Sequence, residues 1–231
     1  MTIIITGASR GIGFSTLKYL SKDKNNKIIV LTRNIDSFWD KVNADEQLIN
    51  ASLHAHYFDL ENVTLESLSQ ITDNIDVLIN NAGLLINKPF HSLDDNDWQS
   101  MFQINILGPA KLIRHLLPLM GLNTNPTHII NIGSMGGFQG SSKFVGLSAY
   151  SSSKAALVSL SECLAEELKH NHIVSNCLCL GAVNTDMLKQ AFPDYQAATS
   201  SDEMGKFIAE FALNGHKYFN GKTLPVSIST P

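Results

Sequence analysis

Seven short hydrophobic runs, rich in β-branched residues, alternate along the chain with longer amphipathic segments. Four of the runs are almost continuously hydrophobic, which is typical of strands that are covered on both faces of a parallel sheet. Each run has the length of a β-strand, and we predict one strand in each of them. The predicted strands are residues 2–6, 27–32, 53–58, 75–80, 127–133, 173–180 and 223–228.

The segments between the runs have the spacing of helices with one hydrophobic face. Phe14, Leu17 and Leu20 share such a face in the first segment, and the leucines of residues 157–168 share another. Strand and helix alternate over the whole chain. This predicts an α/β fold with a doubly wound parallel sheet (a Rossmann fold) of about seven strands, flanked by helices in three α/β/α layers. No repeat or linker interrupts the order, so residues 1–231 are predicted to form a single domain.

The composition gives no reason to expect nucleic acid or a membrane as a binding partner. Hydrophobic residues make up 44% of the chain and charged residues 16%, as in ordinary globular proteins. A net charge of −4 offers no electrostatic attraction to nucleic acid or to an anionic membrane. No hydrophobic stretch has the length of a membrane span and no signal-like segment precedes the first strand, so a cytoplasmic location is expected.

Cysteines and histidines do not form a recognisable metal or redox motif. Cys177 and Cys179 alternate within one predicted strand, which places both side chains on the same face as buried free thiols. The eight histidines are scattered, and neither close pair has a third ligand at a suitable spacing. No metal site is therefore expected.

A glycine-rich segment, TGASRGIG at residues 6–13, joins the first predicted strand to the first helix. Its glycines are spaced GxxxGxG, not the commoner GxGxxG, but the physical requirement is the same. The backbone must approach a pyrophosphate closely and present amides at a helix N-terminus. We predict that a dinucleotide binds here, with a plain strand–helix turn as the alternative. The expected contacts are Gly7, Ser9, Arg10, Gly11, Ile12 and Gly13.

The residue at the end of the second strand selects between the two nicotinamide dinucleotides. In this fold a carboxylate there holds the adenosine ribose, whereas a basic residue accepts a 2′-phosphate. Arg33 occupies the position, followed by Asn34, and Arg10 can reach the same phosphate from the glycine-rich segment. These residues predict NADP(H) as the preferred cofactor. NAD(H) is the alternative, if Arg33 is solvated and Asp36 serves the ribose.

Tyr150 and Lys154 lie at i and i+4, so they share one face of a predicted helix. A free phenol has a pKa of about 10 and is a poor acid or base at neutral pH. A fixed ammonium beside it stabilises the phenolate, lowers that pKa and favours general acid–base catalysis. Ser134, which ends the fifth predicted strand, can donate a hydrogen bond to a carbonyl oxygen beside the phenol.

The motifs occur in the order TGASRGIG, NNAG at residues 80–83, Asn105, Ser134 and YSSSK at residues 150–154. In that order they resemble the short-chain dehydrogenase/reductase family over essentially the whole chain. The resemblance implies that Asn105 holds a water that connects the lysine to solvent. It also implies further cofactor contacts, on the adenosine side and beside the nicotinamide. These are Asp59, Leu60, Asn81, Ala82, Gly83, Tyr150, Lys154, Val183 and Thr185.

The resemblance further implies an NADP(H)-dependent oxidoreductase that acts on CH–OH groups. The nicotinamide would deliver hydride to a carbonyl carbon while Tyr150 supplies a proton to the oxygen, which Ser134 polarises. Lys154 would lower the pKa of the tyrosine, hold the nicotinamide ribose and pass protons through the water at Asn105. Asn105, Ser134, Tyr150 and Lys154 are thus the expected catalytic residues.

Three features depart from the family pattern. Leu180 stands where the family usually has proline before a glycine, which predicts a more mobile lid over residues 184–201. The segment between Ser134 and Tyr150 is longer than usual, and the C-terminal GKTLPVSISTP lacks the usual acidic-Gly-Gly ending. The long segment and the lid carry large hydrophobic side chains, which indicate a small apolar or aromatic carbonyl substrate. The candidate substrate contacts are Phe138, Phe144, Met187 and Phe192.

Two other functions remain open at this point. One is a reductase of 3-oxoacyl chains bound to a carrier protein, which calls for a basic docking surface that the charge of the chain does not indicate. The other is a nucleotide-binding regulator on the same fold, which would not need a tuned tyrosine. Relatives assemble through the helical segments at about residues 95–120 and 149–170, so a homodimer or homotetramer is expected. Their outward faces are expected to include Leu116, Leu119, Ala165 and Leu168.

Overall fold

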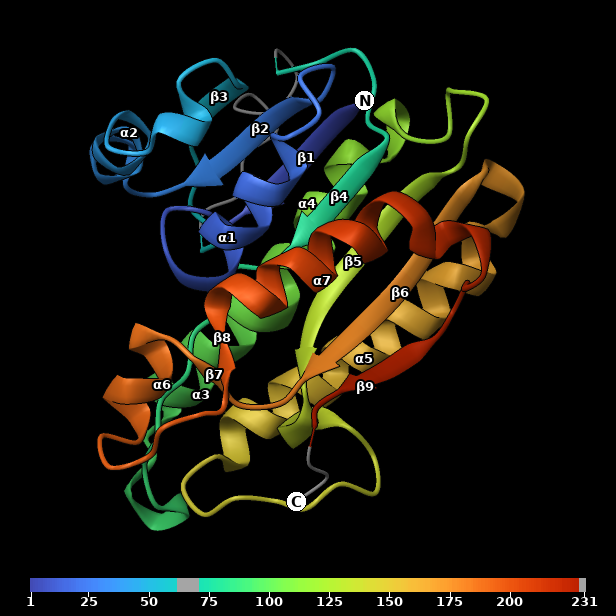
Figure 1. The fold of residues 1–231 in the computed structure, drawn as a ribbon. Helices are drawn as coiled ribbons and strands as arrows, with labels where there is room; N and C mark the ends of the chain where they lie inside the picture. Colours follow the sequence, from blue (N-terminus) through green and yellow to red (C-terminus); the bar gives the residue numbers. More distant parts are fainter. Residues whose placement is uncertain (62–70, 229–231) are drawn as a thin grey trace.

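The computed structural model describes residues 1–61 and 71–228, and its centre is a parallel sheet of seven strands in the order β3-β2-β1-β4-β5-β6-β9 (Figure 1). This confirms the predicted α/β class and the doubly wound sheet. The last part of the unusual C-terminal ending, 229–231, lies outside the described residues. The strands are β1 (Thr2–Thr6), β2 (Lys27–Thr32), β3 (Ser52–Tyr57), β4 (Val77–Asn80), β5 (Thr127–Ser134), β6 (Ile173–Leu180) and β9 (Thr223–Val226).

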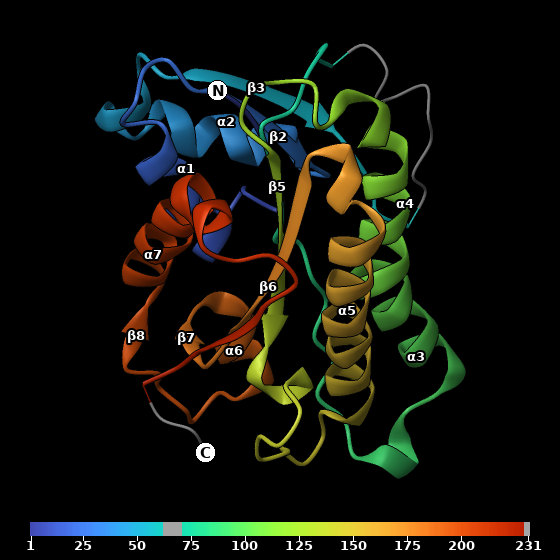
Figure 2. The same ribbon diagram turned by 90° about the vertical axis from the view of Figure 1, so that its right-hand side faces the viewer.

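Helices cover both faces of the sheet and complete the three layers (Figure 2). Among the described residues, no helix has both the length and the hydrophobicity that a membrane span needs. One layer holds α1 (Gly11–Leu20), α2 (Ile35–Asn43) and α7 (Ser201–Asn214), and the other holds α3 (Asp95–Phe102), α4 (Gly108–Leu116) and α5 (Ser148–Glu167). Short 3₁₀ turns are η1 (Glu46–Leu48), η2 (Phe90–Ser92), η4 (Leu117–Leu119), η5 (Met135–Gly137), η6 (Lys169–Asn171) and η7 (Gly215–Lys217).

The central strands are hydrophobic on both faces because helices cover both faces. In β1, Ile3 and Ile5 pack in the cluster beneath α1, α2 and α7, whereas Ile4 packs in the cluster beneath α4. In β2, Ile28 and Ile29 divide between the two clusters in the same way. All five side chains are fully buried. The continuous hydrophobic runs in the sequence thus reflect burial on two faces of a strand with a side-chain period of two.

Four strands differ from their predicted boundaries. β5 ends one residue later than predicted, at Ser134, and β9 ends two residues earlier, at Val226. β3 lies at the edge and is only half-buried, with Tyr57 63% exposed, and it starts and ends one residue earlier than predicted. β4 begins at Val77, two residues later than predicted, because Ile75 forms a single bridge with Met120 instead.

The helical segment expected over residues 95–120 is not one continuous α-helix. A π-helical turn, η3 (Gln103–Leu107), separates α3 from α4. The sequence contains the cause, since Pro109 has no N–H to donate to the carbonyl of Asn105, four residues earlier. A regular α-helix cannot continue past that point, and the wider turn places Asn105 at an irregular position in the backbone.

The prediction that four hydrophobic residues face outward from these helices is wrong for two of them. Leu116 is 1% exposed and Ala165 is 4% exposed. Leu119 and Leu168 are half-buried, and they pack against the hydrophobic cluster between α4 and the sheet. A hydrophobic stripe shows that a helix has a buried face but does not show what covers it, and here the sheet of the same chain covers it. The expected homo-oligomer stays a prediction.

The segment predicted as a lid, residues 184–201, crosses the carboxyl ends of the strands (Figure 1). It begins with β7 (Val183–Asn184), continues through α6 (Asp186–Ala191) and returns in β8 (Thr199–Ser200). β7 and β8 pair in parallel as a small separate ladder, which the sequence did not predict. The ladder ties the two ends of the lid together, and α7 then begins at Ser201.

His128 is a fully buried histidine between β5 and α7. Its Nδ1 lies 3.1 Å from the carbonyl oxygen of Ala212, and its Nε2 lies 3.1 Å from Nδ2 of Asn176. An amide nitrogen only donates, so Nε2 accepts and Nδ1 carries the proton that bonds to Ala212. The neutral ring is therefore satisfied on both sides, and burial lowers the pKa of His128 from 6.5 to about 4.

We expect this histidine to make the fold sensitive to acid. Between pH 6.5 and about 4 the unfolded state binds a proton that the folded ring refuses, so the free energy of unfolding falls as the pH decreases through this window. The full loss corresponds to about 3 kcal/mol. Denaturant titrations between pH 7.5 and pH 4 should show a steeper loss for the wild type than for His128→Gln, which cannot titrate. Parallel pH profiles for the two proteins would contradict this expectation.

Candidate active site

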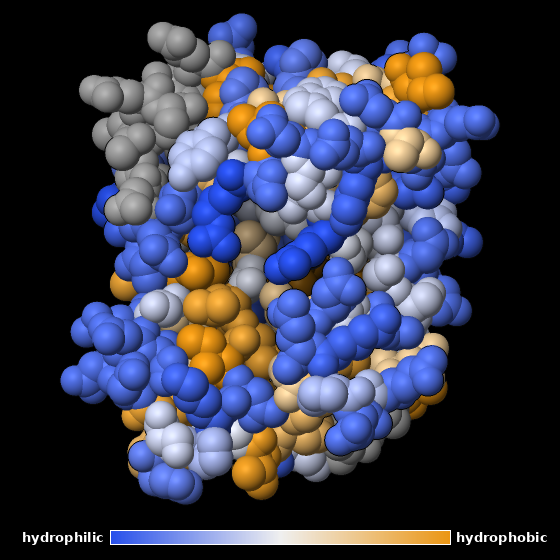
Figure 3. Space-filling model, turned by 90° about the vertical axis from the view of Figure 1, so that its left-hand side faces the viewer, coloured by the Kyte–Doolittle hydropathy of each residue, from blue (hydrophilic) through white to orange (hydrophobic). Residues whose placement is uncertain are grey.

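A cavity of about 940 Å³ lies at the carboxyl ends of the strands, where the strand order reverses between β1 and β4. Open α/β sheets bind ligands at this position. The glycine-rich segment and the start of α2 form one end of the cavity, and the lid and the start of α5 form the other. On the face drawn in Figure 3, hydrophobic side chains gather in a hollow that hydrophilic side chains border.

The glycines of residues 6–13 serve two different needs. Gly7 has a φ of +68°, and a Cβ there would stand 2.8 Å from Cα of Ala82. A Cβ at Gly13 would overlap Nδ2 of Asn81. These two glycines allow close packing against the segment after β4. Gly11, with a φ of +57°, is not crowded, since a Cβ there would make only ordinary van der Waals contact with Cγ2 of Thr185, at 3.7 Å.

The start of α1 is free to bind an anion. Arg10 is in the N-cap position with an extended backbone, and its side chain does not bond to the first turn of the helix. The first amides of a helix lack partners inside it, and they carry the positive end of its dipole. Ser9, Arg10, Gly11, Ile12 and Gly13 all line the cavity. A pyrophosphate therefore fits at this end.

Two asparagines after β4 hold the neighbouring elements in place. Nδ2 of Asn81 donates to the carbonyl oxygens of Thr6 and Gly7 at 2.9 and 3.1 Å. Nδ2 of Asn80 donates to Oδ1 of Asn131 at 2.8 Å, and the Asn131 amide continues to Ser161 in α5. One asparagine thus fixes the glycine-rich segment, while the other links β4 to β5 and α5. Asn81, Ala82 and Gly83 all line the cavity.

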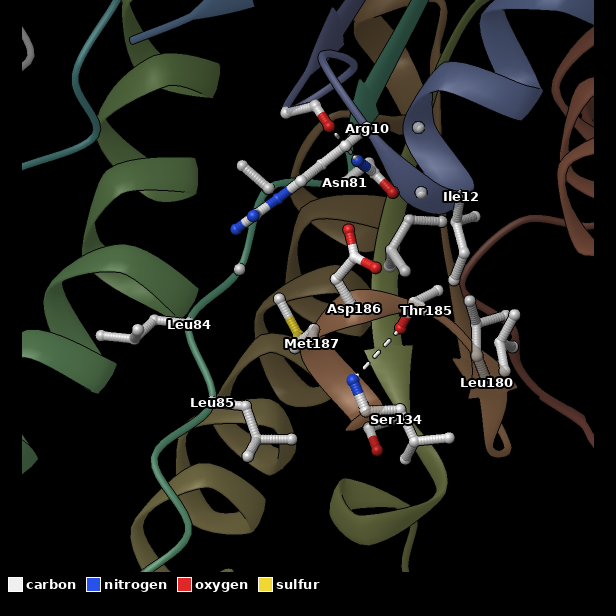
Figure 4. A pocket seen from close by; sticks show the side chains of 18 of the residues that line it. Arg10, Ile12, Asn81, Leu84, Leu85, Ser134, Leu180, Thr185, Asp186 and Met187 are labelled. Carbon is white, nitrogen blue, oxygen red and sulfur yellow. Dashed lines mark hydrogen bonds between the residues drawn. The ribbon is translucent and has the colours of Figure 1, made fainter. Parts of the chain in front are cut away.

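Positive side chains gather at the end of the cavity formed by β2 and α2. Arg10 and Arg33 both line it, and so does Lys41, which no sequence pattern indicated. Lys41 lies four residues after Ser37, so both line the cavity from the same face of α2. Figure 4 shows the side chain of Arg10 extended across the cavity.

Other residues predicted at the adenosine end also form hydrogen bonds with the backbone. Oδ1 of Asn34 accepts from the N–H of Ser37 at 3.0 Å and caps α2, although Asn34 also lines the cavity. Asp59 and Leu60 line it too, and Oδ1 of Asp59 accepts from the N–H of Glu61. Asp36, the alternative ribose ligand, is absent from the described residues that line the cavity.

Ser134, Tyr150 and Lys154 converge at the other end, from the end of β5 and the first turns of α5. Nζ of Lys154 donates to the carbonyl oxygen of Ile132 at 2.8 Å and lies 6.0 Å from the centre of the Tyr150 ring. The lysine is thus positioned by β5, beneath the tyrosine.

Burial controls the proton affinity of both groups. It raises the pKa of Tyr150, and the interaction with the Ser134 hydroxyl, which lowers that pKa, is the smaller effect. Burial lowers the pKa of Lys154 from 10.5 to about 8. The expectation that Lys154 depresses the pKa of Tyr150 is therefore wrong for this structure. Taking the phenol out of water disfavours its phenolate form more than its surroundings favour it.

The side chain of Asn105 joins the segment after β4 to α5 by hydrogen bonds. Its Oδ1 accepts from the N–H of Leu84 and its Nδ2 donates to the carbonyl oxygen of Leu84, both at 2.8 Å. The same Nδ2 donates to Oγ of Ser153 at 2.9 Å. A Cβ at Gly83 would stand 3.3 Å from Oδ1 of Asn105 and 3.4 Å from Nζ of Lys154, so the glycine leaves room for both. The proposed water at Asn105 stays a prediction.

Three of the four candidate substrate contacts line the cavity, namely Phe144, Met187 and Phe192. Phe138 does not line it and packs instead against the small cluster of Met135, Cys177 and Cys179. Figure 4 shows Leu84 and Leu85 on the segment after β4 and Met187 on the lid, at the start of α6. Leu147 from the long segment and Leu188 and Tyr195 from the lid line the cavity as well. The sequence patterns did not indicate Leu84 and Leu85, which follow β4 in a segment with no regular pattern.

The lid begins from a well-paired strand end. Leu180 pairs with Ser134 on one side and with Val226 on the other, so β6 continues to the position where the family usually has proline. Val183 and Thr185 line the cavity, and Oγ1 of Thr185 caps α6 by accepting from the N–H of Leu188. In the described part of the chain, no group of three or more His, Cys, Asp or Glu side chains could hold a metal ion.

We expect Lys154 to lower the stability of the protein. Its pKa is about 8 when folded and 10.5 when unfolded, so the cost of burying the charge is fully present below pH 8 and decreases as the pH rises toward 10.5. The shift corresponds to a loss of about 3 kcal/mol in the free energy of unfolding. Replacing the lysine also removes its hydrogen bond to Ile132, which contributes about 1 kcal/mol in the opposite direction. Denaturation at pH 7 should thus find Lys154→Met more stable by about 2 kcal/mol. The exposed Lys169→Met is the control, and a less stable Lys154→Met would refute the expectation.

Comparison with known proteins identifies the family. The sequence profile of the family described as short chain dehydrogenase matches residues 1–196. A 3-oxoacyl-[acyl-carrier-protein] reductase of Aquifex aeolicus is 29% identical over 191 residues, covering 80% of this chain and 74% of that protein. An uncharacterized oxidoreductase of Staphylococcus saprophyticus is 31% identical over 215 residues, with coverages of 91% and 88%. The solved Pseudomonas aeruginosa RhlG/NADP active-site complex is 25% identical, with coverages of 98% and 94% and a TM-score of 0.83. The chain belongs to the short-chain dehydrogenase/reductase family of oxidoreductases.

Proposed function

We propose that the protein is an NADP(H)-dependent reductase of small carbonyl compounds with an apolar or aromatic body. The observation that carries the proposal is that Ser134, Tyr150 and Lys154 line the same cavity as Arg10 and Arg33. A proton donor and a set of phosphate-binding cations thus share one space. Its volume is at the upper end of the range for ligand sites, which suits a dinucleotide with a small second ligand.

The residues present fit a phosphorylated dinucleotide. The first turn of α1 and the uncrowded Gly11 suit its pyrophosphate. Arg10, Arg33 and Lys41 place three cations at the adenosine end, where Asp36 does not line the cavity. The Pseudomonas aeruginosa relative, solved with NADP, supports the same cofactor. When bound, the dinucleotide supplies or accepts the hydride.

The protein's own groups then handle the proton. The raised pKa of Tyr150 keeps the phenol protonated at neutral pH, so it can donate a proton to the oxygen of the carbonyl that is reduced. Ser134 interacts with that phenol and is placed to orient the same oxygen. Lys154, with a pKa of about 8, is mostly protonated at neutral pH. This pKa is close enough to neutral pH for the lysine to return a proton to the tyrosine.

The wall around Tyr150 supports a substrate with an apolar body. Hydrophobic side chains from three segments line the same cavity as the phenol: Leu85 after β4, Phe144 and Leu147 before α5, and Met187 and Phe192 in the lid. Such walls bind by removing apolar surface from water. The lid over them also keeps water away from the reacting carbonyl.

A second candidate substrate is a 3-oxoacyl thioester. The comparison favours it, because the Aquifex aeolicus relative is a 3-oxoacyl-[acyl-carrier-protein] reductase. The hydrophobic wall that would hold an aromatic ketone could also hold the start of an acyl chain. The two substrates differ in length and in the second carbonyl group, so a direct comparison of rates distinguishes them.

We expect turnover with NADPH and at least one class of carbonyl, measured as loss of reduced-nicotinamide absorbance. The panel contains aromatic aldehydes, diketones, pterins, sugars and a 3-oxoacyl thioester. Tyr150→Phe removes the proton donor and should lower the rate by about 10² to 10⁴-fold while NADPH binding stays nearly intact. Wild-type turnover in this variant would refute the role of Tyr150. A protein that binds NADPH but turns over no member of the panel would favour the regulator instead.

We expect NADPH to bind at least about tenfold more tightly than NADH, which is about 1.4 kcal/mol. The physical reason is the 2′-phosphate, which Arg10, Arg33 and Lys41 are placed to receive. Fluorescence titration of Arg33→Ala and Lys41→Ala should show a reduced preference, chiefly through weaker binding of NADPH. Lys22→Ala, a charge loss outside the cavity, is the control. Equal affinities of the wild type for the two dinucleotides would contradict the proposed cofactor.

A further inference from the structure

The lid is tied to the opposite wall of the cavity by the side chain of Asn87. Its Nδ2 donates a hydrogen bond of 2.7 Å to the carbonyl oxygen of Ala191, the last residue of α6. The final carbonyl groups of a helix have no partner inside the helix, so a donor from elsewhere is favourable there. The two residues are 104 positions apart, and the bond joins the segment after β4 to the lid.

The oxygen of the same amide packs closely against Gly146, in the loop between β5 and α5. Gly146 has a φ of +85°, and a Cβ at this position would overlap Oδ1 of Asn87. The next backbone N–H, that of Lys88, donates to the carbonyl oxygen of Gly146 at 3.1 Å. Asn87 is therefore the point where three segments meet, namely the segment after β4, the loop before α5 and the lid.

The wall that carries Asn87 is firmly anchored on both sides. Three residues earlier, both backbone groups of Leu84 are bonded to the side chain of Asn105. One residue later, Nζ of Lys88 bonds to both carboxylate oxygens of Asp97 at 2.8 and 2.7 Å, at the start of α3. Asn87 thus projects from a fixed support.

The lid, in contrast, holds itself together mainly by local bonds. The N–H of Lys189 donates to the carbonyl of Thr185, and the N–H of Phe192 donates to that of Leu188. None of the six residues of α6 is buried. Elements with few buried contacts open at low free-energy cost. One hydrogen bond from a fixed wall is therefore enough to shift the balance between open and closed lids.

We propose that Asn87 is a positioning residue that latches the lid over Tyr150 and thereby sets the affinity for the carbonyl substrate. The substrate part rests on the proposed function, whereas the latch is a property of the lid itself. The bond lies at the exposed edge of the cavity, so water replaces it when the lid opens. A weak, reversible latch suits a lid that opens in every turnover to release product.

Asn87→Ala removes the donor and should open the lid more often. Lys189 is exposed on α6, so the rate of tryptic cleavage after it reports on lid opening without any substrate. The expected increase is about fivefold, the factor that the net worth of one hydrogen bond allows. The KM for the best carbonyl substrate should rise by a similar factor. NADPH affinity should stay unchanged, because its phosphate contacts lie at the other end of the cavity.

Asn87→Asp is a sharper variant. It keeps the shape of the side chain and the oxygen beside Gly146, but it turns a negatively charged acceptor toward the carbonyl of Ala191. The rate of tryptic cleavage and the KM should rise at least as much in this variant as in Asn87→Ala. Gly146→Ala should also release the lid by displacing the amide, and its effect on cleavage should not add to that of Asn87→Ala. Asn25→Ala, at an exposed asparagine before β2, is the control and should change neither cleavage nor KM.

The outcomes separate the latch from the proposed function. Wild-type cleavage rates and wild-type KM in both Asn87 variants would overturn the latch. Faster cleavage together with a raised KM supports it in full. Faster cleavage in a protein that turns over no carbonyl supports the latch on the lid and contradicts the proposed function.

Discussion

The hydrogen bonds between Thr6 and Asn81 hold the point at which the strand order reverses, and the site is built around that point. Oγ1 of Thr6 accepts from the N–H groups of Asn81 and Ala82, both at 3.0 Å, while the Asn81 amide bonds back to β1 and Gly7. The chain thus leaves β1 and β4 in opposite directions at a fixed geometry. These bonds give partners to the backbone N–H groups of Asn81 and Ala82, as buried polar groups require. The glycine-rich segment starts on one side, and the wall that carries Asn87 starts on the other.

Burial of polar groups in this arrangement shifts the pKa values of the candidate catalytic residues. Tyr150 and Lys154 have shifted pKa values because α5 presses them against the end of β5, where water is excluded. The shifts go in opposite directions, so in the folded protein the pKa of the phenol lies above that of the ammonium, whereas the free ammonium has the slightly higher pKa. Transfer of a proton from the Lys154 ammonium to a Tyr150 phenolate is therefore favourable. The stability lost by burying Lys154 is offset by the hydrophobic clusters on both faces of the sheet.

Sequence patterns were sufficient to predict structural features whose cause is local or repeated along the chain. The isoleucines of β1 indicate a strand covered on both faces, and the glycines at positions 7, 11 and 13 indicate close approach of backbone. Tyr150 and Lys154 were found by their spacing within one helix. Lys41 and Leu85 were missed because they line the cavity from elements far apart in the chain. A residue's distance from such a cavity depends on packing that no short pattern contains.

The sequence by itself determined the order of strands and helices, the single doubly wound sheet and the set of polar residues at its carboxyl edge. These depend on hydrophobic periodicity and on turn chemistry, which are properties of short segments. Only the tertiary structure decided that Phe138 packs away from the cavity, that burial raises the pKa of Tyr150, and that Asn87 meets Ala191 across the lid. Each of these depends on contacts between segments distant in sequence, and desolvation and long-range hydrogen bonds exist only once the chain has folded.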